Sequence, residues 1–249
     1  GGGGDGSARP PPGQVSRADD TDPPGAYPDT VPNTLPDDDF PSWRRDEDLI
    51  AEAARPRVRV VSCRDVEVVI GRGGKADLEL RRDAIRADGV PIYRRRGGGG
   101  AVVLGPGNLV VSLAAPLPGI GGVTSAFRAI TAWLTGGLDV AGIPGVRGEG
   151  VSDLALGDRK VGGSCIYRTR GFVYYASTLL TDPDLDLVER YLQHPPREPG
   201  YRRGRNHRDF MGRLPAAAAV SEFDERLQAI LAGATPDLGP IFRASPSPR

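Results

Sequence analysis

The stretch RRRGGGGAVV, residues 94–103, decides how the rest of the sequence is interpreted. Three arginines lead into four glycines, and an apolar segment begins at Ala101. Glycine lets backbone N–H groups approach an anion closely, and neighbouring guanidinium groups bind its oxygens through paired hydrogen bonds. The stretch therefore predicts an anion-binding loop between two strands. A flexible hairpin loop with exposed arginines is the alternative that composition alone leaves open.

The spacing of the glycines argues against two common nucleotide-binding loops. It matches neither the phosphate loop G-x-x-x-x-G-K-[ST] nor the dinucleotide loop G-x-G-x-x-G that opens a helix. An ordinary kinase or dehydrogenase is therefore disfavoured, and other motifs have to identify the ligand.

Composition narrows the class of protein. The chain has 249 residues, 39% of them hydrophobic, which suffices for one main core. Lysine plus arginine balances aspartate plus glutamate at 32 each, so we expect neither a nucleic acid nor a membrane as partner. We find no apolar run of about 18 residues and no signal-peptide pattern, and therefore expect a cytoplasmic protein. Two cysteines and two histidines argue against a transition-metal site.

The distribution of proline, glycine and aspartate predicts one domain between two tails. Residues 1–40 are rich in these types and lack apolar periodicity, which predicts a disordered tail. Residues 235–249 predict a flexible C-terminal tail, and residues 41–234 predict the compact domain.

Apolar periodicity within that domain predicts an α+β fold, with a mixed, largely antiparallel sheet and covering helices. The expected strand pairs are a hairpin of 57–62 with 66–70, a hairpin of 153–156 with 159–167 around Gly157-Asp158, and strands 90–94, 109–114 and 171–180. The expected helices are 77–86, 123–134 ending at Gly136-Gly137, 184–192 and 220–231.

A second motif places one lysine between a hairpin turn and two glycines. Lys160 follows Asp158-Arg159 and precedes Val161-Gly162-Gly163-Ser164. An ammonium group held there suits an adenylated acyl group, because it can contact the acyl carbonyl oxygen and a phosphate oxygen together. A surface lysine beside a turn is the alternative for this motif taken alone.

Together the two motifs resemble those of lipoate–protein ligases. Arg94-Arg95, Gly98-Gly99-Gly100-Ala101-Val102 and Gly107-Asn108-Leu109 resemble the R-R-x-S-G-G-G-x-V block and the following G-N-L of that family. Asp153-Leu154 and Lys160-Val161-x-Gly163-Ser164 resemble its D-L and K-I-x-G-S block. The resemblance extends from about residue 68 to about residue 180, with a looser continuation to 214.

The resemblance implies the fold shared by biotin and lipoate protein ligases, with residues 41–234 as a catalytic domain. It implies ATP-dependent attachment of lipoate, through lipoyl-adenylate and with Mg²⁺, to a lysine of a lipoyl-acceptor carrier domain. Lys160 would be the catalytic residue, and Asp153 would meet the nucleotide or Mg²⁺. The implied ligand- and nucleotide-binding residues are Arg94, Arg95, Gly98, Gly99, Gly100, Ala101, Asn108, Asp153, Gly163 and Ser164.

The sequence departs from the family pattern in three places. Leu104 stands where the family usually has histidine, and Gly97 stands at a common serine or threonine position. Residues 174–180 replace the usual H-G-T-L-L ending. The residues after the predicted domain leave no room for the small accessory domain that many members carry, so we expect a separate accessory ligase subunit.

Three further residues keep other functions open. Cys165 follows the lysine block and would be the acyl acceptor of an octanoyl or lipoyl transferase, although a cysteine on a strand is usually a buried apolar residue. Arg205 and His207 lie in the charged segment 201–210, which is either a solvated connector or a loop that meets the nucleotide or an acidic carrier domain. A non-catalytic lipoyl-domain-binding protein is the remaining alternative, and the acyl group stays open among lipoate, octanoate and biotin.

Overall fold

The fold is α+β, as the sequence predicts, but its strands form two sheets instead of one. A computed structural model describes residues 1–2, 40–119, 121–219 and 221–239. Its larger sheet is antiparallel throughout, with strand order β1-β5-β9-β8-β7-β6. The bounds of these strands are β1 Arg57–Ser62, β5 Asn108–Pro116, β6 Arg147–Glu149, β7 Asp153–Leu156, β8 Arg159–Arg168 and β9 Phe172–Leu180. No helix in the described residues is long and apolar enough to span a membrane.

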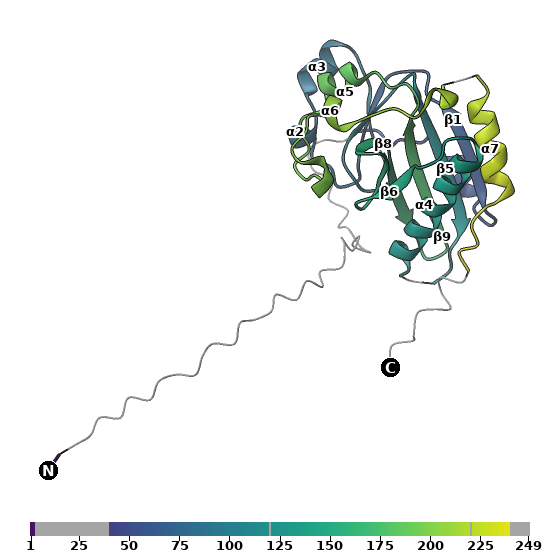
Figure 1. Ribbon diagram of the computed structural model, residues 1–249, viewed down its shortest axis with the longest axis horizontal. Coiled ribbons are helices and arrows are strands. Elements are labelled where there is room, and N and C mark those ends of the chain that lie inside the picture. The colour runs from purple at the N-terminus through teal and green to yellow at the C-terminus, as the bar shows by residue number, and fades with distance from the viewer. Residues whose placement is uncertain (3–39, 120, 220, 240–249) are drawn as a thin grey trace.

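The smaller sheet is mixed and has the order β3-β2-β4. Strand β2 pairs in parallel with β3 and antiparallel with β4. Short helices pack on this sheet and form a lobe beside the larger sheet (Figure 1). The strands are β2 Glu67–Ile70, β3 Ile92–Arg94 and β4 Val102–Leu104, and the helices are α2 Ala76–Glu79, α3 Arg82–Ala87, α5 Leu185–Tyr191 and α6 His207–Phe210.

Alternation along β5 separates the two faces of the larger sheet. Leu109, Val111 and Leu113 lie in the main core with helices α4 (Val123–Val140) and α7 (Phe223–Gly233). Val110 and Ala114 point to the opposite face, because successive side chains of a strand alternate. Helices therefore cover one face (Figure 1), and the other face is left for β4, helix α1 (Glu47–Ala51) and the candidate site.

The predicted hairpin of 57–62 with 66–70 is wrong. Strand β1 pairs with β5 in the larger sheet, whereas β2 pairs with β3 and β4 in the smaller one. The chain crosses between the sheets at Cys63, which is buried against Leu104 and Val110. Apolar periodicity identifies a strand but does not identify its partner.

Two predicted helices have different limits in the structure. The segment 77–86 is divided into α2 and α3, because Leu80 forms a bridge with Leu192. Helix α4 continues through Gly136 and Gly137 to Val140. A Cβ atom at Gly137 would lie 2.3 Å from the Leu231 side chain, so this glycine allows close packing of α7 instead of ending the helix.

The remaining predicted elements are confirmed within a few residues. The hairpin of β7 and β8 turns at Gly157, whose φ of +62° favours glycine. Most of the predicted tails lie outside the described residues. At their inner ends, Phe40 packs on the smaller sheet and Leu238 is buried in the main core.

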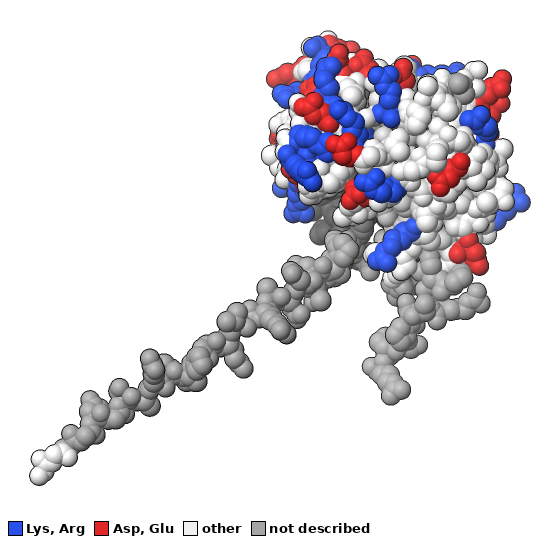
Figure 2. Space-filling view, in the orientation of Figure 1, with Lys and Arg blue, Asp and Glu red and all other residues white. Residues whose placement is uncertain are grey.

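Charges of both signs gather on the lobe that carries α2, α3, α5 and α6 (Figure 2). Many of them are paired, as in the ion pairs Arg82–Asp77, Arg190–Asp88 and Arg208–Asp186. Exposed ion pairs contribute little to stability individually. Their effect here is to leave this face without a large field of one sign.

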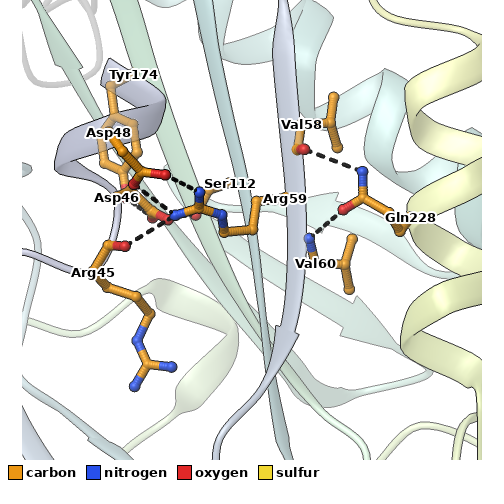
Figure 3. Close-up of polar contacts among 9 residues, drawn as sticks. All are labelled: Arg45, Asp46, Asp48, Val58, Arg59, Val60, Ser112, Tyr174 and Gln228. Carbon is orange, nitrogen blue, oxygen red and sulfur yellow. Dashed lines mark hydrogen bonds and ion pairs between the residues drawn. The ribbon is translucent and has the colours of Figure 1, made fainter. Parts of the chain in front are cut away.

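Strand β1 is an edge strand, and Gln228 of α7 covers part of its free backbone edge (Figure 3). The Gln228 amide on α7 accepts from the Val60 N–H at 2.6 Å and donates to the Val58 carbonyl at 3.1 Å. Arg59 points the other way and donates to Asp46 at 3.1 Å. Pairing of the backbone groups of an edge strand protects it from association with other chains.

We expect Gln228→Ala to lower the free energy of unfolding by about 1–2 kcal/mol, because two partly buried backbone groups lose their hydrogen bonds. Urea denaturation measures the change. Glu225→Ala on the exposed side of α7 is the matched control and should change stability by less than about 0.5 kcal/mol. Equal effects of the two substitutions would contradict this role of Gln228.

Candidate functional site

The two motifs meet at one cavity on the face of the larger sheet that α4 and α7 leave uncovered. The cavity measures about 70 Å³. One part of its wall is polar and the other is apolar. The polar part includes Arg95, Gly99, Gly100, Ser152, Lys160 and Ser164, and the apolar part includes Trp43, Val69, Val102, Leu104, Val110 and Ala176.

The glycine loop is held from inside by Arg95. Its guanidinium group donates to the carbonyl oxygens of Gly98 at 2.7 Å and Gly100 at 2.8 Å, and also to that of Val69 at 3.1 Å. On the far side of the loop, the buried Glu79 carboxylate accepts the Ala101 N–H at 2.6 Å. The N–H of Ala101, a predicted ligand-binding residue, is therefore engaged within the chain.

The loop leaves a set of backbone donors available. Within the described residues, the N–H groups of Gly98, Gly99 and Gly100 make no hydrogen bond, and Gly99 and Gly100 are exposed. Gly99 has a φ of +90°, and a Cβ atom at Gly71 would lie 2.0 Å from its carbonyl oxygen. Glycine at both positions thus permits the tight turn that exposes these donors.

Arg94 and Asn108 are placed away from the cavity. Arg94 is buried, and its guanidinium group donates to the carbonyl oxygens of Gly71 at 2.9 Å and Gly74 at 3.1 Å. The Asn108 side chain accepts the Gly105 N–H at 3.1 Å and closes the turn before β5. Neither residue lines the cavity, so their contacts support the surrounding backbone.

A register shift in the β7–β8 hairpin brings Lys160 to the cavity. The pairing shifts between Leu154 and Ala155, which inserts one extra residue into β8. Lys160 then lies beside Gly163, where an added Cβ atom would meet the lysine Nζ at 3.2 Å. Asp153 pairs directly opposite Gly163. The bulge and the glycine together allow the lysine side chain to reach Asp153.

Lys160 is held by an ion pair. Its Nζ lies 2.7 Å from the Asp153 Oδ1, and the two side chains are 25% and 11% exposed. Lys75 and Lys160 are the only lysines among the 32 lysine and arginine residues of the chain. A compact ammonium group is thus placed at the cavity in a chain that uses guanidinium groups nearly everywhere else.

Tyr201 holds the second carboxylate oxygen of Asp153. Its hydroxyl donates to the Asp153 Oδ2 at 2.9 Å. Burial, followed by the negative charge of Asp153, raises the pKa of the Tyr201 hydroxyl, which therefore stays a protonated donor. No local pattern predicts this contact, because 48 positions separate the two residues.

Arg205 and His207 lie outside the cavity lining. Arg205 donates to the Asp158 carbonyl oxygen at 2.9 Å and ties the segment 201–210 to the β7–β8 turn. The His207 Nδ1 lies 3.6 Å from a Glu189 carboxylate oxygen. Burial lowers the pKa of His207, and the nearby Arg202 charge adds to this effect. The segment reaches the site through Tyr201 instead.

Cys165 and Ser164 both line the cavity, but the Ser164 hydroxyl is turned toward the main core. The Ser164 hydroxyl forms hydrogen bonds with Tyr175 at 2.7 Å and Ser177 at 3.1 Å. Cys165 is buried, and a Cβ atom at Gly97 would lie 2.7 Å from its sulfur. The absence of a side chain at Gly97 therefore makes room for this thiol. Burial raises the pKa of Cys165, which disfavours the nucleophilic thiolate.

The geometry provides little for a metal ion. Among the described residues, no group of three or more histidine, cysteine, aspartate or glutamate side chains is placed to bind one. Both oxygens of Asp153, the residue predicted to meet Mg²⁺, are engaged by Lys160 and Tyr201. Mg²⁺ usually takes one or two carboxylates plus substrate phosphates. The Asp153 carboxylate fits its role as partner of Lys160 better, and we assign no reaction step to Mg²⁺.

Comparison with known proteins identifies the family of the chain. Residues 38–232 match the family model of the lipoyl protein ligase A/B catalytic domain. The chain belongs to this family. A relative from Aeropyrum pernix, assigned to lipoate-protein ligase A, is 35% identical over 134 residues, which cover 49% of this chain and 50% of the relative. The chain spans half or less of the length of the first curated relatives it matches.

Solved structures of this ligase family share the fold. A lipoate-protein ligase A bound with ATP has a TM-score of 0.61 at 23% identity, covering 75% of this chain and 74% of that one. A second structure comes from an archaeal lipoylation system, a bipartite lipoate protein ligase and its E2 lipoyl domain from Thermoplasma acidophilum. It has a TM-score of 0.60 at 22% identity. That match covers 76% of this chain and 74% of the Thermoplasma chain.

We expect both thiols of this ligase-family chain to react slowly with iodoacetamide at pH 8 in the native protein and rapidly in urea. Burial raises the pKa of Cys63 to about 11 and also raises that of Cys165, so little thiolate is present. Mass spectrometry of labelled peptides measures each rate, and Cys63→Ala leaves Cys165 as the single thiol. Native labelling of Cys165 as fast as that in urea would show an accessible, reactive thiol.

Proposed function

We propose that this chain forms an acyl-adenylate from ATP and lipoate and passes the acyl group to a lysine on a carrier domain. One observation carries the proposal. The fixed ammonium of Lys160 and the exposed donors of the glycine loop line the same cavity, whose remaining wall is apolar. An acyl-adenylate has the matching parts, namely an apolar chain, a carbonyl group and an anionic phosphate.

Each part of the cavity suits one part of that molecule. The N–H groups of Gly98, Gly99 and Gly100 are available to phosphate or carboxylate oxygens. The Lys160 ammonium lies on the opposite strand pair and stabilises negative charge on the carbonyl and phosphate oxygens. The Asp153 carboxylate holds that ammonium in place. Such fixed charges act most strongly where charge develops during the reaction.

The proposed reaction has two balanced steps. In the first, a lipoate carboxylate oxygen bonds to the α-phosphorus of ATP, and the bond to the leaving pyrophosphate breaks. In the second, the neutral ε-amine of the acceptor lysine bonds to the acyl carbon, the bond to AMP breaks, and the amine releases a proton. The enzyme forms no covalent bond in either step, so its contribution is orientation and charge stabilisation.

A carrier domain and an accessory partner belong to the proposal. The Thermoplasma ligase is bipartite and acts in a system with an E2 lipoyl domain. This supports testing the present chain both alone and with an accessory ligase protein. Lipoate is the proposed acyl group because a related structure from Thermoplasma acidophilum contains lipoic acid, and ATP is proposed because another relative binds it.

We expect Lys160→Met to lower lipoate-dependent exchange of pyrophosphate into ATP by at least about 100-fold, because a preorganised charge at the reacting oxygens is lost. The assay follows labelled pyrophosphate with lipoate present and absent. Lys75→Met is the matched control, since it removes the only other lysine, which is exposed and does not line the cavity.

Three outcomes separate the candidate functions. Exchange that needs lipoate and Lys160, with or without the accessory protein, supports the ligase. Acyl transfer from a carrier protein without ATP would replace it by a transferase. Binding of a lipoyl domain with no exchange and no transfer, with the accessory protein present, would leave a non-catalytic binding protein.

We expect Cys165→Ala to keep its rate of acyl transfer to a carrier domain within about twofold, because the proposed path has no thioester. Transfer is followed by the mass of the acceptor domain. The substitution also removes a buried sulfur that packs on Gly97, so circular dichroism and thermal unfolding serve as folding controls. Loss of transfer in a folded Cys165→Ala protein would favour the thioester mechanism.

A further inference from the structure

Trp43 forms an outer wall of the cavity and comes from outside both sequence motifs. The indole lines the cavity but is also partly exposed to solvent. Its Nε1 donates to the Glu67 Oε1 at 3.0 Å, and the Arg45 guanidinium group donates to the same oxygen at 2.9 Å. The Arg45 group also lies 5.7 Å from the indole centroid. One carboxylate thus binds both side chains and holds the indole against the cavity.

The cavity is too small for the proposed acyl group while Trp43 stays in this position. It measures about 70 Å³, whereas an engineered apolar cavity that binds benzene measures about 150 Å³. Lipoate is larger than benzene, because it carries a dithiolane ring on an aliphatic acid chain. The cavity can therefore enclose the acyl chain only after part of its wall moves.

The indole is the part of the apolar wall that is free to move. Leu104 and Val110 are 1% and 3% exposed and belong to paired strands, so moving them would disrupt the packed sheet. The backbone of Trp43 is fixed too, since its N–H donates to the Arg94 carbonyl oxygen at 2.9 Å. Val102 is also partly exposed but lies on the paired strand β4, whereas the Trp43 side chain lies outside the strands and makes one hydrogen bond.

The backbone that carries Trp43 is anchored on its other side as well (Figure 3). Asp46 is buried and accepts hydrogen bonds from Ser112 at 2.5 Å and Tyr174 at 2.7 Å. A rotation of the indole about its own side-chain bonds is therefore favoured over displacement of the whole segment. Such rotations of partly exposed side chains are fast compared with catalysis.

We propose that Trp43 is the gate of the acyl pocket and determines which acyl chains the pocket admits, with Glu67 as the residue that positions the gate. This inference rests on the proposed function for the identity of the acyl group. A bound lipoyl chain occupies the space vacated by the indole, which turns outward into solvent. A large acyl group binds only the open form. Its apparent affinity is therefore the intrinsic affinity multiplied by the fraction of molecules in which the gate is open.

Fluorescence of Trp43 tests the direction of movement. Trp133 lies on α4 and its Nε1 donates to the Leu231 carbonyl oxygen. Trp133→Phe leaves Trp43 as the single tryptophan, which is excited selectively at long wavelength. We expect lipoate to increase acrylamide quenching of Trp43, because the opened indole faces solvent. Decreased quenching on lipoate binding would mean that Trp43 stays in place and is covered by the ligand, which overturns the gate.

Substitution tests the selectivity. We expect Trp43→Ala to bind lipoate at least about fivefold more tightly than the wild type, with a smaller gain for hexanoate, because the opening cost is removed. Isothermal titration calorimetry without ATP measures both affinities, and Trp133→Phe is the matched control with unchanged affinity. An affinity within twofold of the wild type for lipoate would overturn the proposal.

A second variant keeps the test independent of folding and of catalysis. Glu67→Ala retains the indole but removes its hydrogen bond, and we expect greater quenching of Trp43 in the ligand-free protein. Unchanged quenching in a folded Glu67→Ala protein would overturn the role of Glu67. If lipoate binding follows these expectations but pyrophosphate exchange is absent, the gate stands and the proposed adenylation fails.

Discussion

The hydrogen bonds from Arg95 to the glycine loop are the interaction on which the site depends. The guanidinium group binds the carbonyl oxygens of Gly98 and Gly100. The Gly98 carbonyl and the Gly99 N–H belong to one peptide unit and point in opposite directions, so holding that oxygen inward helps to turn the Gly99 donor outward. A loop with four consecutive glycines has a large entropy to lose on ordering, and these hydrogen bonds oppose that loss.

The second part of the site depends on an irregularity in a strand. A regular β8 would place Lys160 and Gly163 on opposite faces of the sheet, since side chains alternate. The extra residue in β8 brings them to one face, and the absence of a side chain at Gly163 gives the lysine space to reach Asp153. Tyr201 then fixes the second oxygen of Asp153 from a segment that follows the sheet. The ammonium is thereby held on rigid elements.

Arginine contributes to this chain mainly as a structural donor. Arg94 binds backbone carbonyls behind the loop, and Arg205 joins the segment 201–210 to the β7–β8 turn. The resemblance had implied that Arg94 contacts a ligand and left Arg205 as a candidate. Five donors in a planar group make arginine well suited to bind several carbonyl oxygens at once, and its presence in a motif therefore does not by itself assign it to a ligand.

The sequence alone determined the glycine loop, the lysine block, the β7–β8 hairpin and the α+β class, because each depends on short-range patterns of residue type. The partner of β1, the length of α4 and the inward direction of Arg94 were decided by the tertiary structure. So were the contacts of Asp153 with Tyr201, of Ala101 with Glu79, and of Trp43 with the cavity. These contacts join residues that lie far apart along the chain, and their energies depend on packing geometry, which leaves no local signal in the sequence.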